Sequence, residues 1–272
     1  MTDLRQLRVG CKFTYVAEVP TAAVFMVRPA ASAAVAMEGG RWLTDPPVPV
    51  HDYTDIYGNE CARTVLPVGR STFGFSAVAV VPNATEDADQ DAPEVPPGAL
   101  PDEALLYTLP SRYCLPDLLA DEAWQRFGAL APGYQRVQAV CDHVHQHVTF
   151  QYGSTTATST AADVNATRLG VCRDFAHLAI SFCRALNIPA RYTFGYLPDM
   201  DVPPDPAPMD FAAWMEVWLG DRWWTFDPRN NARRKGRVVI ARGRDAADVA
   251  VATTFGGPVL ESMTVDSEEV PD

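Results

Sequence analysis

Residues 167–192 place a cysteine at the start of a predicted helix. The segment TRLGVCRDFAHLAISFCRALNIPARY has an apolar helical run that begins near Cys172 and stops at Asn187, ahead of Pro189. The dipole and the free N–H groups of a helix N-terminus favour an anion, and such placement lowers a thiol pKa to roughly 3.5–7.5. We therefore expect Cys172 to be a nucleophile, with a plain core cysteine as the alternative, which suits the mid-helix Cys183 better.

The same predicted helix carries one polar stripe. Its members are spaced at helical intervals, and the remaining positions are apolar or small. They are Arg173, His177, Ser181 and Arg184. We expect this stripe to face water. His177, about 140° around the helix from Cys172, is then a surface or supporting residue and not the general base.

Residues 209–231, MDFAAWMEVWLGDRWWTFDPRNN, predict two strands joined by a tight turn. Gly220-Asp221 is typical of a two-residue type II′ turn. The resulting register puts position 212 and Asp227 on one face, about 7–8 Å apart. A histidine at 212 would contact both Asp227 and Cys172, as a Cys-His-Asp triad requires, but the chain has Ala212 there. Alternatively, Asp227 is only a strand-end turn residue.

Several further residues are candidates for contacts with a substrate. The register puts Trp214, Trp218 and Trp223 on the face of position 212, which predicts an aromatic cleft unless these rings serve ordinary packing. We count Trp214, Asp174 and Tyr152 as candidate substrate-binding residues. Glu216 lies on the same face and is a conceivable substitute base.

The remaining segments divide the chain into four parts. Residues 1–83 are rich in short β-branched and aromatic runs, which predicts an N-terminal β-sandwich-like domain. Residues 84–98 are acidic and proline-rich, and we expect a linker or mobile loop. Residues 99–256 form the expected core domain, and residues 257–272 an acidic tail that is ordered only in part.

Composition limits the kinds of partner. The 272 residues carry a formal net charge of −12, which argues against nucleic acid and anionic membranes. The N-terminus lacks a signal-peptide core, so we expect a cytoplasmic protein with free thiols. His143 and His147, at i and i+4, form a conceivable metal pair, but helix-end surface histidines are the favoured interpretation. We expect no metal and no cofactor.

These motifs together resemble the bacterial transglutaminase-like superfamily. The resemblance rests on GVCRDFAHLAISFCRALNIPARY, MDFAAWMEVWL and RWWTFDPRNN, and it extends upstream to DIYGNECAR and LPSRYC and downstream to residues 236–256. It implies an α+β fold with a papain-like core, in which the helix-start cysteine packs on an antiparallel sheet after an N-terminal β-sandwich-like domain. It also implies Cys172 as the nucleophile and Asp227 as the third triad member.

The chain departs from the family pattern at two positions. The pattern D-F-H-A-W reads Asp210-Phe211-Ala212-Ala213-Trp214 here, and Asn230 stands where R-H-N is frequent. The loss of the base is either engineered or a natural divergence. We expect cysteine-based acyl transfer, impaired as written, that acts on a peptide or protein amide and can use an amine acceptor. A non-catalytic binding or scaffold protein on the same fold is the alternative. The oligomeric state is not encoded in any motif.

Overall fold

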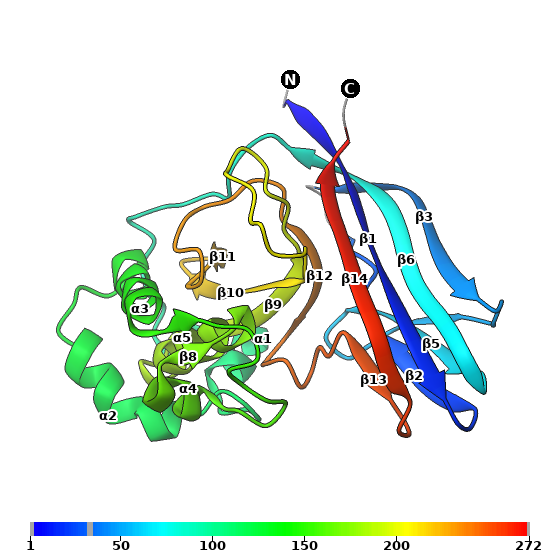
Figure 1. Ribbon diagram of the computed structural model, residues 1–272. Helices are drawn as coiled ribbons and strands as arrows, with labels where there is room; N and C mark the ends of the chain where they lie inside the picture. Colours follow the sequence, from blue (N-terminus) through cyan, green and yellow to red (C-terminus); the bar gives the residue numbers. More distant parts are fainter. Residues whose placement is uncertain (1–2, 32–34, 271–272) are drawn as a thin grey trace.

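A computed structural model describes residues 3–31 and 35–270 (Figure 1). Its strands form three four-stranded sheets and one two-stranded sheet. The helices gather on one side of the molecule, and the long strands of the N-terminal region lie on the other side (Figure 1). The fold is α+β, as expected from the sequence.

The first N-terminal sheet has the strand order β14-β1-β6-β3. Its strands are β1 (Leu4–Ala17), β3 (Ala36–Asp45), β6 (Gly69–Pro82) and β14 (Val259–Glu269). Alternate residues of β1 are buried, from Leu7 through Phe13 to Tyr15, so one face of this sheet packs inward.

The second N-terminal sheet packs against the first. It has the order β13-β2-β5-β4. Its strands are β2 (Thr21–Phe25), β4 (His51–Thr54), β5 (Glu60–Leu66) and β13 (Ala252–Thr254). Phe25 of β2 meets Phe73 of β6 with ring centroids 4.0 Å apart and meets Phe13 of β1 at 5.4 Å. These contacts join the two sheets as a sandwich.

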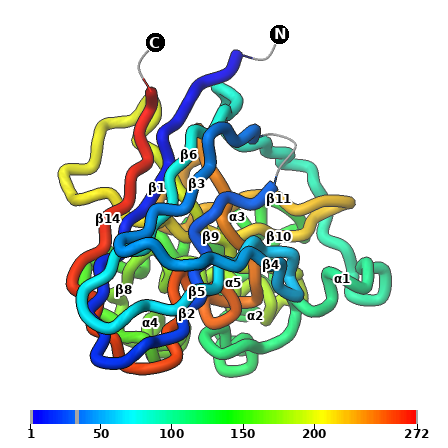
Figure 2. Tube along the Cα trace, turned by 90° about the vertical axis from the view of Figure 1, so that its right-hand side faces the viewer, coloured from blue at the N-terminus to red at the C-terminus, as the bar shows by residue number. Residues whose placement is uncertain are grey.

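The C-terminal segment completes this sandwich, so the expectation of a partly ordered tail is wrong for residues 259–269. β14 pairs antiparallel with β1 from Leu7 opposite Glu269 to Val16 opposite Val259. Figure 1 and Figure 2 both show β1 and β14 side by side. The acidic residues of this strand face water, and hydrogen bonds to β1 hold its backbone. Residues 271–272 lie outside the described residues.

The acidic proline-rich segment is also not a mobile loop. The Glu94 carboxylate accepts from the Gly133 N–H at 3.0 Å and pairs with Arg136 at 3.1 Å. The Pro93 carbonyl accepts from the Gly220 N–H at 2.8 Å. Residues 84–98 therefore form a strap across the core domain, fixed by contacts that composition does not encode.

The core sheet carries the predicted hairpin. It has the order β11-β10-β9-β12. Its strands are β9 (Ala190–Tyr196), β10 (Ala212–Leu219), β11 (Arg222–Phe226) and β12 (Val238–Gly243). Leu219 pairs with Arg222, and the register continues to Met215 opposite Phe226, as predicted. Gly220 has φ of +62°, which suits the first position of a type II′ turn.

Helix α5 (Cys172–Ala185) is the central helix. It packs against β9 and β10 and also contacts the other three long helices. Those are α2 (Pro116–Phe127), α3 (Tyr134–His147) and α4 (Ala161–Thr167). The shorter elements are η1 (Pro97–Ala99), α1 (Asp102–Leu105), η2 (Leu106–Thr108), β7 (Thr149–Phe150) and β8 (Leu169–Gly170). Within the described residues, no helix has the length and apolar character needed to cross a bilayer.

The polar stripe of α5 is buried, so the expected water-facing surface is wrong. Arg184 is 2% exposed and donates to the Leu109 carbonyl at 3.0 Å and to the Arg244 carbonyl at 2.6 Å. His177 is 1% exposed, and its ring stacks on Tyr113 at 5.1 Å. Two segments distant in sequence thus cover His177 and Arg184.

The sandwich and the core domain meet next to position 212. The Tyr196 hydroxyl of β9 donates to the Val27 carbonyl at 2.8 Å. The Phe211 ring stacks with Phe13 of β1 at 6.5 Å. The N-terminal domain therefore holds the residue that immediately precedes β10.

Candidate active site

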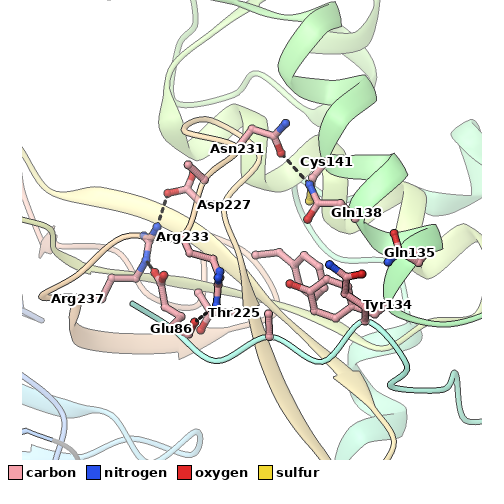
Figure 3. A pocket seen from close by; sticks show the side chains of 14 residues that line it. Glu86, Tyr134, Gln135, Gln138, Cys141, Thr225, Asp227, Asn231, Arg233 and Arg237 are labelled. Carbon is pink, nitrogen blue, oxygen red and sulfur yellow. Dashed lines mark hydrogen bonds and ion pairs between the residues drawn. The ribbon is translucent and has the colours of Figure 1, made fainter. Parts of the chain in front are cut away.

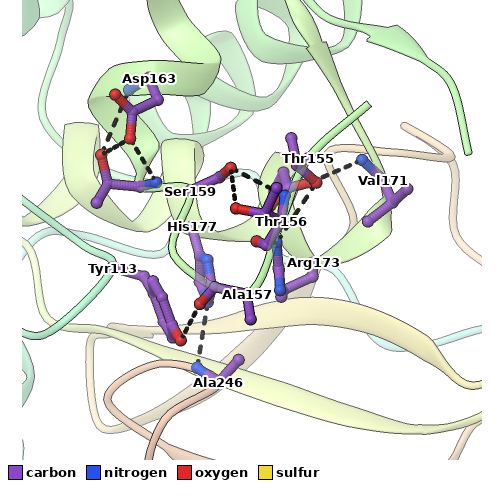
Figure 4. A network of polar contacts seen from close by, with 12 residues as sticks. Tyr113, Thr155, Thr156, Ala157, Ser159, Asp163, Val171, Arg173, His177 and Ala246 are labelled. Carbon is purple, nitrogen blue, oxygen red and sulfur yellow. Dashed lines mark hydrogen bonds and ion pairs between the residues drawn. The ribbon is translucent and has the colours of Figure 1, made fainter. Parts of the chain in front are cut away.

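A buried carboxylate fixes the start of α5. The Asp174 side chain accepts from the Val171 N–H at 2.9 Å and from the Thr155 hydroxyl at 2.6 Å, and it pairs with Arg173 at 2.9 Å. Figure 4 shows Thr155, Val171 and Arg173 converging around this point. Asp174 is 1% exposed and does not line the cavity at Cys172. It therefore positions the helix start, and the expected contact with a substrate has no support in the geometry.

Gly170 allows this arrangement. A β-carbon added at Gly170 would lie 2.9 Å from the Asp174 Cβ atom, which is closer than real contacts. The glycine ahead of the cysteine is thus needed for close approach of the capping carboxylate.

Cys172 opens into a cavity of about 160 Å³. Its Sγ atom lies 3.8 Å from the Phe211 carbonyl, which accepts from the thiol. The other five cysteines are buried, whereas Cys172 is partly exposed. Phe150, Tyr152 and Phe211 supply the aromatic wall of the cavity.

The pKa of Cys172 does not follow the expectation from helix geometry. Burial raises the pKa of the thiol to about 11, and the negative charge of Asp210 adds to the rise. The Ala213 N–H, the positive charge of Arg229 and the Arg173 N–H lower the pKa, but they do not offset burial. The prediction of a low pKa is therefore wrong for this chain, which has no imidazolium at 212 to stabilise a thiolate.

Ala212 begins β10 opposite Gly195 of β9. It lines the same cavity as Cys172. A methyl group at this position offers no acceptor for the thiol proton. The structure thus places Cys172 and position 212 at one cavity, and the catalytic roles expected of these positions stay a prediction.

Asp227 follows β11 and has four donors on its two oxygens. Oδ1 accepts from the N–H groups of Arg229 at 3.0 Å and Asn230 at 2.9 Å. Oδ2 accepts from Asn230 Nδ2 at 2.7 Å and from Arg237 Nη2 at 2.6 Å. Burial alone would raise the pKa of Asp227, but Arg237 and Asn230 outweigh it and hold the pKa below its usual value.

A second cavity, of about 310 Å³, lies on the Asp227 side (Figure 3). Arg237 bridges Asp227 and Glu86, and Glu86 belongs to the strap. Asp227 lines this cavity, whereas Cys172 lines the other. Asn230 joins the two, because it lines the Cys172 cavity and donates to Asp227.

The three candidate tryptophans lie away from the Cys172 cavity. Trp214 has 0% exposure, and the Arg237 guanidinium covers its ring at 4.7 Å. Trp218 and Trp223 pack edge to face at 5.4 Å. The predicted tryptophan cleft is therefore wrong. Tyr152 lines the Cys172 cavity and is 56% exposed, so it remains available to a substrate.

Neither Glu216 nor His177 is placed to act as a base. Glu216 is 5% exposed and pairs with Arg191 at 2.5 Å and with Arg242 at 2.8 Å. Burial lowers the pKa of His177 to about 3, and its Nε2 atom accepts from the Ala246 N–H at 3.1 Å. Figure 4 shows His177 directed toward Ala246 and Tyr113. Both residues stabilise the core.

The histidine pair on α3 also has a structural setting. His143 and His147 stack with ring centroids 5.1 Å apart. His147 Nε2 lies 2.9 Å from the Asn165 carbonyl. Across residues 3–31 and 35–270, no group of three or more His, Cys, Asp or Glu side chains could hold a metal ion.

Sequence reasoning missed two residues of the Cys172 cavity, Asp210 and Arg229. Both are adjacent to predicted site positions, and that adjacency was the available signal. Asp210 lies two residues before position 212, and Arg229 two residues after Asp227. The sequence marks Asn230 only as a departure from the family pattern, and its hydrogen bond to Asp227 appears in the structure alone.

Comparison with known proteins finds both a matching family profile and a similar crystal structure. The sequence profile of the transglutaminase-like superfamily matches residues 123–228. A crystal structure from Cytophaga hutchinsonii, described as a candidate cysteine protease, superposes with a TM-score of 0.88 at 30% identity and covers 100% of this chain and 92% of that one.

Mycobacterial relatives match over shorter segments. Uncharacterised proteins of Mycobacterium tuberculosis and Mycobacterium bovis are 33% identical over 163 residues, or 56% of this chain. The chain spans about half the length of these relatives, 51%. A Mycobacterium leprae protein is 38% identical over 101 residues, which is 36% of each chain. The structural match over the whole length and the family profile across Cys172 and Asp227 agree: the chain belongs to the transglutaminase-like superfamily.

Proposed function

We propose that this protein is a cysteine-based acyl-transfer enzyme with impaired base catalysis. The observation that carries the proposal is the shared cavity of Cys172 and Ala212 at the start of a buried helix. The thiol attacks a carboxamide or peptide carbonyl, a thioester forms, and an amine or water resolves it. The Arg173 N–H at the helix start and the Ala213 N–H of β10 both act on the Cys172 thiol and are positioned to stabilise the oxyanion.

Impairment follows from the side chains around the thiol. The methyl group of Ala212 accepts no proton, and Asp227 has its oxygens occupied by Asn230 and Arg237. Loss of a triad residue costs about 10⁴-fold or more in related thiol and serine mechanisms. We infer slow single turnovers in place of efficient catalysis.

The cavity walls favour a peptide side chain with an apolar body. Phe150, Leu197 and Met209 contribute apolar surface. Two wall cations are already paired, Arg229 with Asp205 at 3.5 Å and Arg234 with Asp199 at 3.1 Å. The walls therefore offer no uncompensated cation to an acidic substrate, and a peptide or protein amide is the proposed acyl donor.

The saturation of Asp227 favours a second candidate, a binding protein that uses the same cavity without turnover. An orienting carboxylate that is locked to Arg237 and Asn230 no longer presents a free lone pair toward position 212. The acyl-transfer proposal requires covalent chemistry at Cys172, whereas the binding proposal does not.

Intact-mass analysis after incubation with p-nitrophenyl acetate tests this distinction. The expected result is one acetyl adduct on Cys172, together with release of nitrophenolate, and loss of both in Cys172→Ser. A glutamine-donor peptide with an alkylamine acceptor is then tested over the same pH range, 6–10. If wild type forms no adduct on Cys172 with either donor, acyl transfer is excluded. Saturable peptide binding in that case would support the binding candidate.

A further inference from the structure

Asp210 is the ionisable residue next to the reacting thiol. It precedes Phe211, whose carbonyl accepts from Cys172 Sγ at 3.8 Å. One Asp210 oxygen, Oδ1, accepts from the Phe211 N–H at 2.7 Å. The Asp210 side chain lines the same cavity as Cys172 and Ala212. The backbone of residues 210–212 thus holds a carboxylate beside both positions.

The other charged groups of this cavity are mutually compensated, whereas Asp210 is not. Arg229 pairs with Asp205, and Arg234 pairs with Asp199. Among residues 3–31 and 35–270, no cation lies within ion-pair distance of Asp210. Burial raises the pKa of Asp210, with the Phe211 N–H as the one opposing contact. The carboxylate in turn raises the pKa of the neighbouring Tyr152, after burial of that phenol, and of Cys172.

The alternatives for a base are already occupied or enclosed. Glu216 is held by two arginines, and Asp227 by Arg237 and Asn230. His177 is buried with its Nε2 atom bonded to Ala246. Asp199 and Asp205 also line the cavity, but each is paired with an arginine. Asp210 is therefore the cavity carboxylate whose free lone pairs are not drawn to a cation.

We propose that Asp210, through one water molecule, is the proton acceptor for Cys172 in place of the missing histidine. The thiol makes no direct hydrogen bond to Asp210, and the cavity of about 160 Å³ has room for a bridging water. This assignment rests on the acyl-transfer function proposed above.

The proton balance of each step is simple. In acylation an S–C bond forms and the C–N bond of the amide breaks. The thiol proton passes through water to the Asp210 carboxylate and then to the leaving amine. In hydrolysis an O–C bond forms and the C–S bond breaks. The proton of the attacking water goes to Asp210 and then to Sγ, which restores both groups.

Asp210→Asn tests the assignment, because the two possible roles of the carboxylate have opposite signs. The negative charge of Asp210 disfavours ionisation of the Cys172 thiol, so its removal should speed alkylation. A base at the same position accepts the thiol proton during acylation, so its removal should slow the burst. In Asp210→Asn we expect the nitrophenolate burst from p-nitrophenyl acetate at pH 7 to slow by about tenfold or more. Iodoacetamide alkylation of Cys172 should quicken by about threefold, equal to half a pKa unit.

The pH profile and matched variants complete the test. The wild-type burst should rise with ionisation of Asp210 and level off at neutral pH, whereas in Asp210→Asn it should rise only with the thiolate. Asp210→Glu should restore part of the burst. The matched control is Asp221→Asn, which removes the same charge from the exposed hairpin turn and should change neither rate.

The outcomes separate this inference from the proposed function. If the burst and alkylation both quicken in Asp210→Asn, or if the burst is unchanged, Asp210 only repels the thiolate and the inference is overturned. A burst that persists in Cys172→Ser instead overturns acyl transfer at Cys172 itself. The two failures therefore give different results.

Discussion

Two cavities with different charged surroundings are connected through Asn230, which lines one of them and donates to Asp227 in the other. On one side, Cys172 faces the Ala212 methyl group and the unpaired Asp210 carboxylate in about 160 Å³. On the other side, about 310 Å³ is bordered by the closed ion cluster of Asp227, Arg237 and Glu86. The comparison teaches that Cys172 lies in a partly open cavity beside a carboxylate without a cationic partner, whereas Asp227 is part of a buried ion cluster.

The burial of the ion cluster explains why Asp227 has a structural role. The side chains of Arg237 and Asp227 are 6% and 2% exposed. Removing one partner of a buried pair leaves the other charge desolvated and uncompensated, which costs far more than loss of a surface pair. Asp227 therefore contributes to folding stability whether or not the site turns over.

The largest expected effect breaks the ion cluster. Asp227→Ala should lower the free energy of unfolding by about 3–5 kcal/mol, because Arg237 keeps only Glu86 as a partner and the donors of Arg229 and Asn230 lose their buried acceptor. Urea denaturation followed by tryptophan fluorescence measures the change. Cys172→Ala, at the partly exposed thiol, and Asp221→Ala, in the hairpin turn, should each cost less than about 1.5 kcal/mol. An equal loss in Asp227→Ala and Asp221→Ala would contradict the structural role.

The next effect restores the base. Ala212→His should raise turnover of p-nitrophenyl acetate or a glutamine-donor peptide at least 100-fold, within the usual range of about 10²–10⁴ for a positioned base. The imidazole would enter the cavity that holds Cys172. The control is Ala212→His with Cys172→Ala, which should show no gain. Background activity in the single variant, with Cys172 still reactive, would favour the binding function.

A smaller effect follows the ionisation of the thiol. Because the pKa of Cys172 is raised to about 11, iodoacetamide labelling should increase tenfold per pH unit from 7 to 9.5 without a plateau. Cys141, on the Asp227 side, is buried with a pKa well above the usual thiol value, so it should stay unlabelled. Mass-mapped labelling measures both thiols. A plateau for wild-type Cys172 below pH 8 would restore the low pKa predicted from the helix start.

The sequence predicted those features that depend on local pattern. The start of α5 at Cys172, the Gly220 turn and the register of β10 with β11 each follow from residues within one helix or hairpin. That register sufficed to place Ala212 in the Cys172 cavity. Local pattern therefore predicted that Cys172 and position 212 lie at one cavity.

The failures all involve contacts between segments distant in sequence. The helical pattern predicts that the stripe with His177 and Arg184 faces water. The segments near Leu109 and Arg244 cover this stripe instead, and they are distant from it in sequence. The acidic composition of residues 259–269 predicts a tail, but this segment pairs with β1. The predicted low pKa of Cys172 is wrong for the same reason, because burial by other segments raises this pKa more than the contacts at the helix start lower it.

The smallest expected effect sharpens the role of Asn230. An imidazole at 212 needs a lone pair of Asp227 for orientation, but Asn230 Nδ2 already donates to Oδ2 at 2.7 Å and Arg237 shares that oxygen. Adding Asn230→Ala to Ala212→His should therefore raise turnover by about a further tenfold, the lower range for an orienting partner. Asn230→Ala alone should bring no gain, because position 212 still lacks a base. Asn230 Oδ1 also accepts from Arg229 at 3.0 Å, so the stability of each variant is measured alongside the rate. If Ala212→His has the same turnover with and without Asn230→Ala, at equal stability, Asn230 does not compete with the imidazole for Asp227.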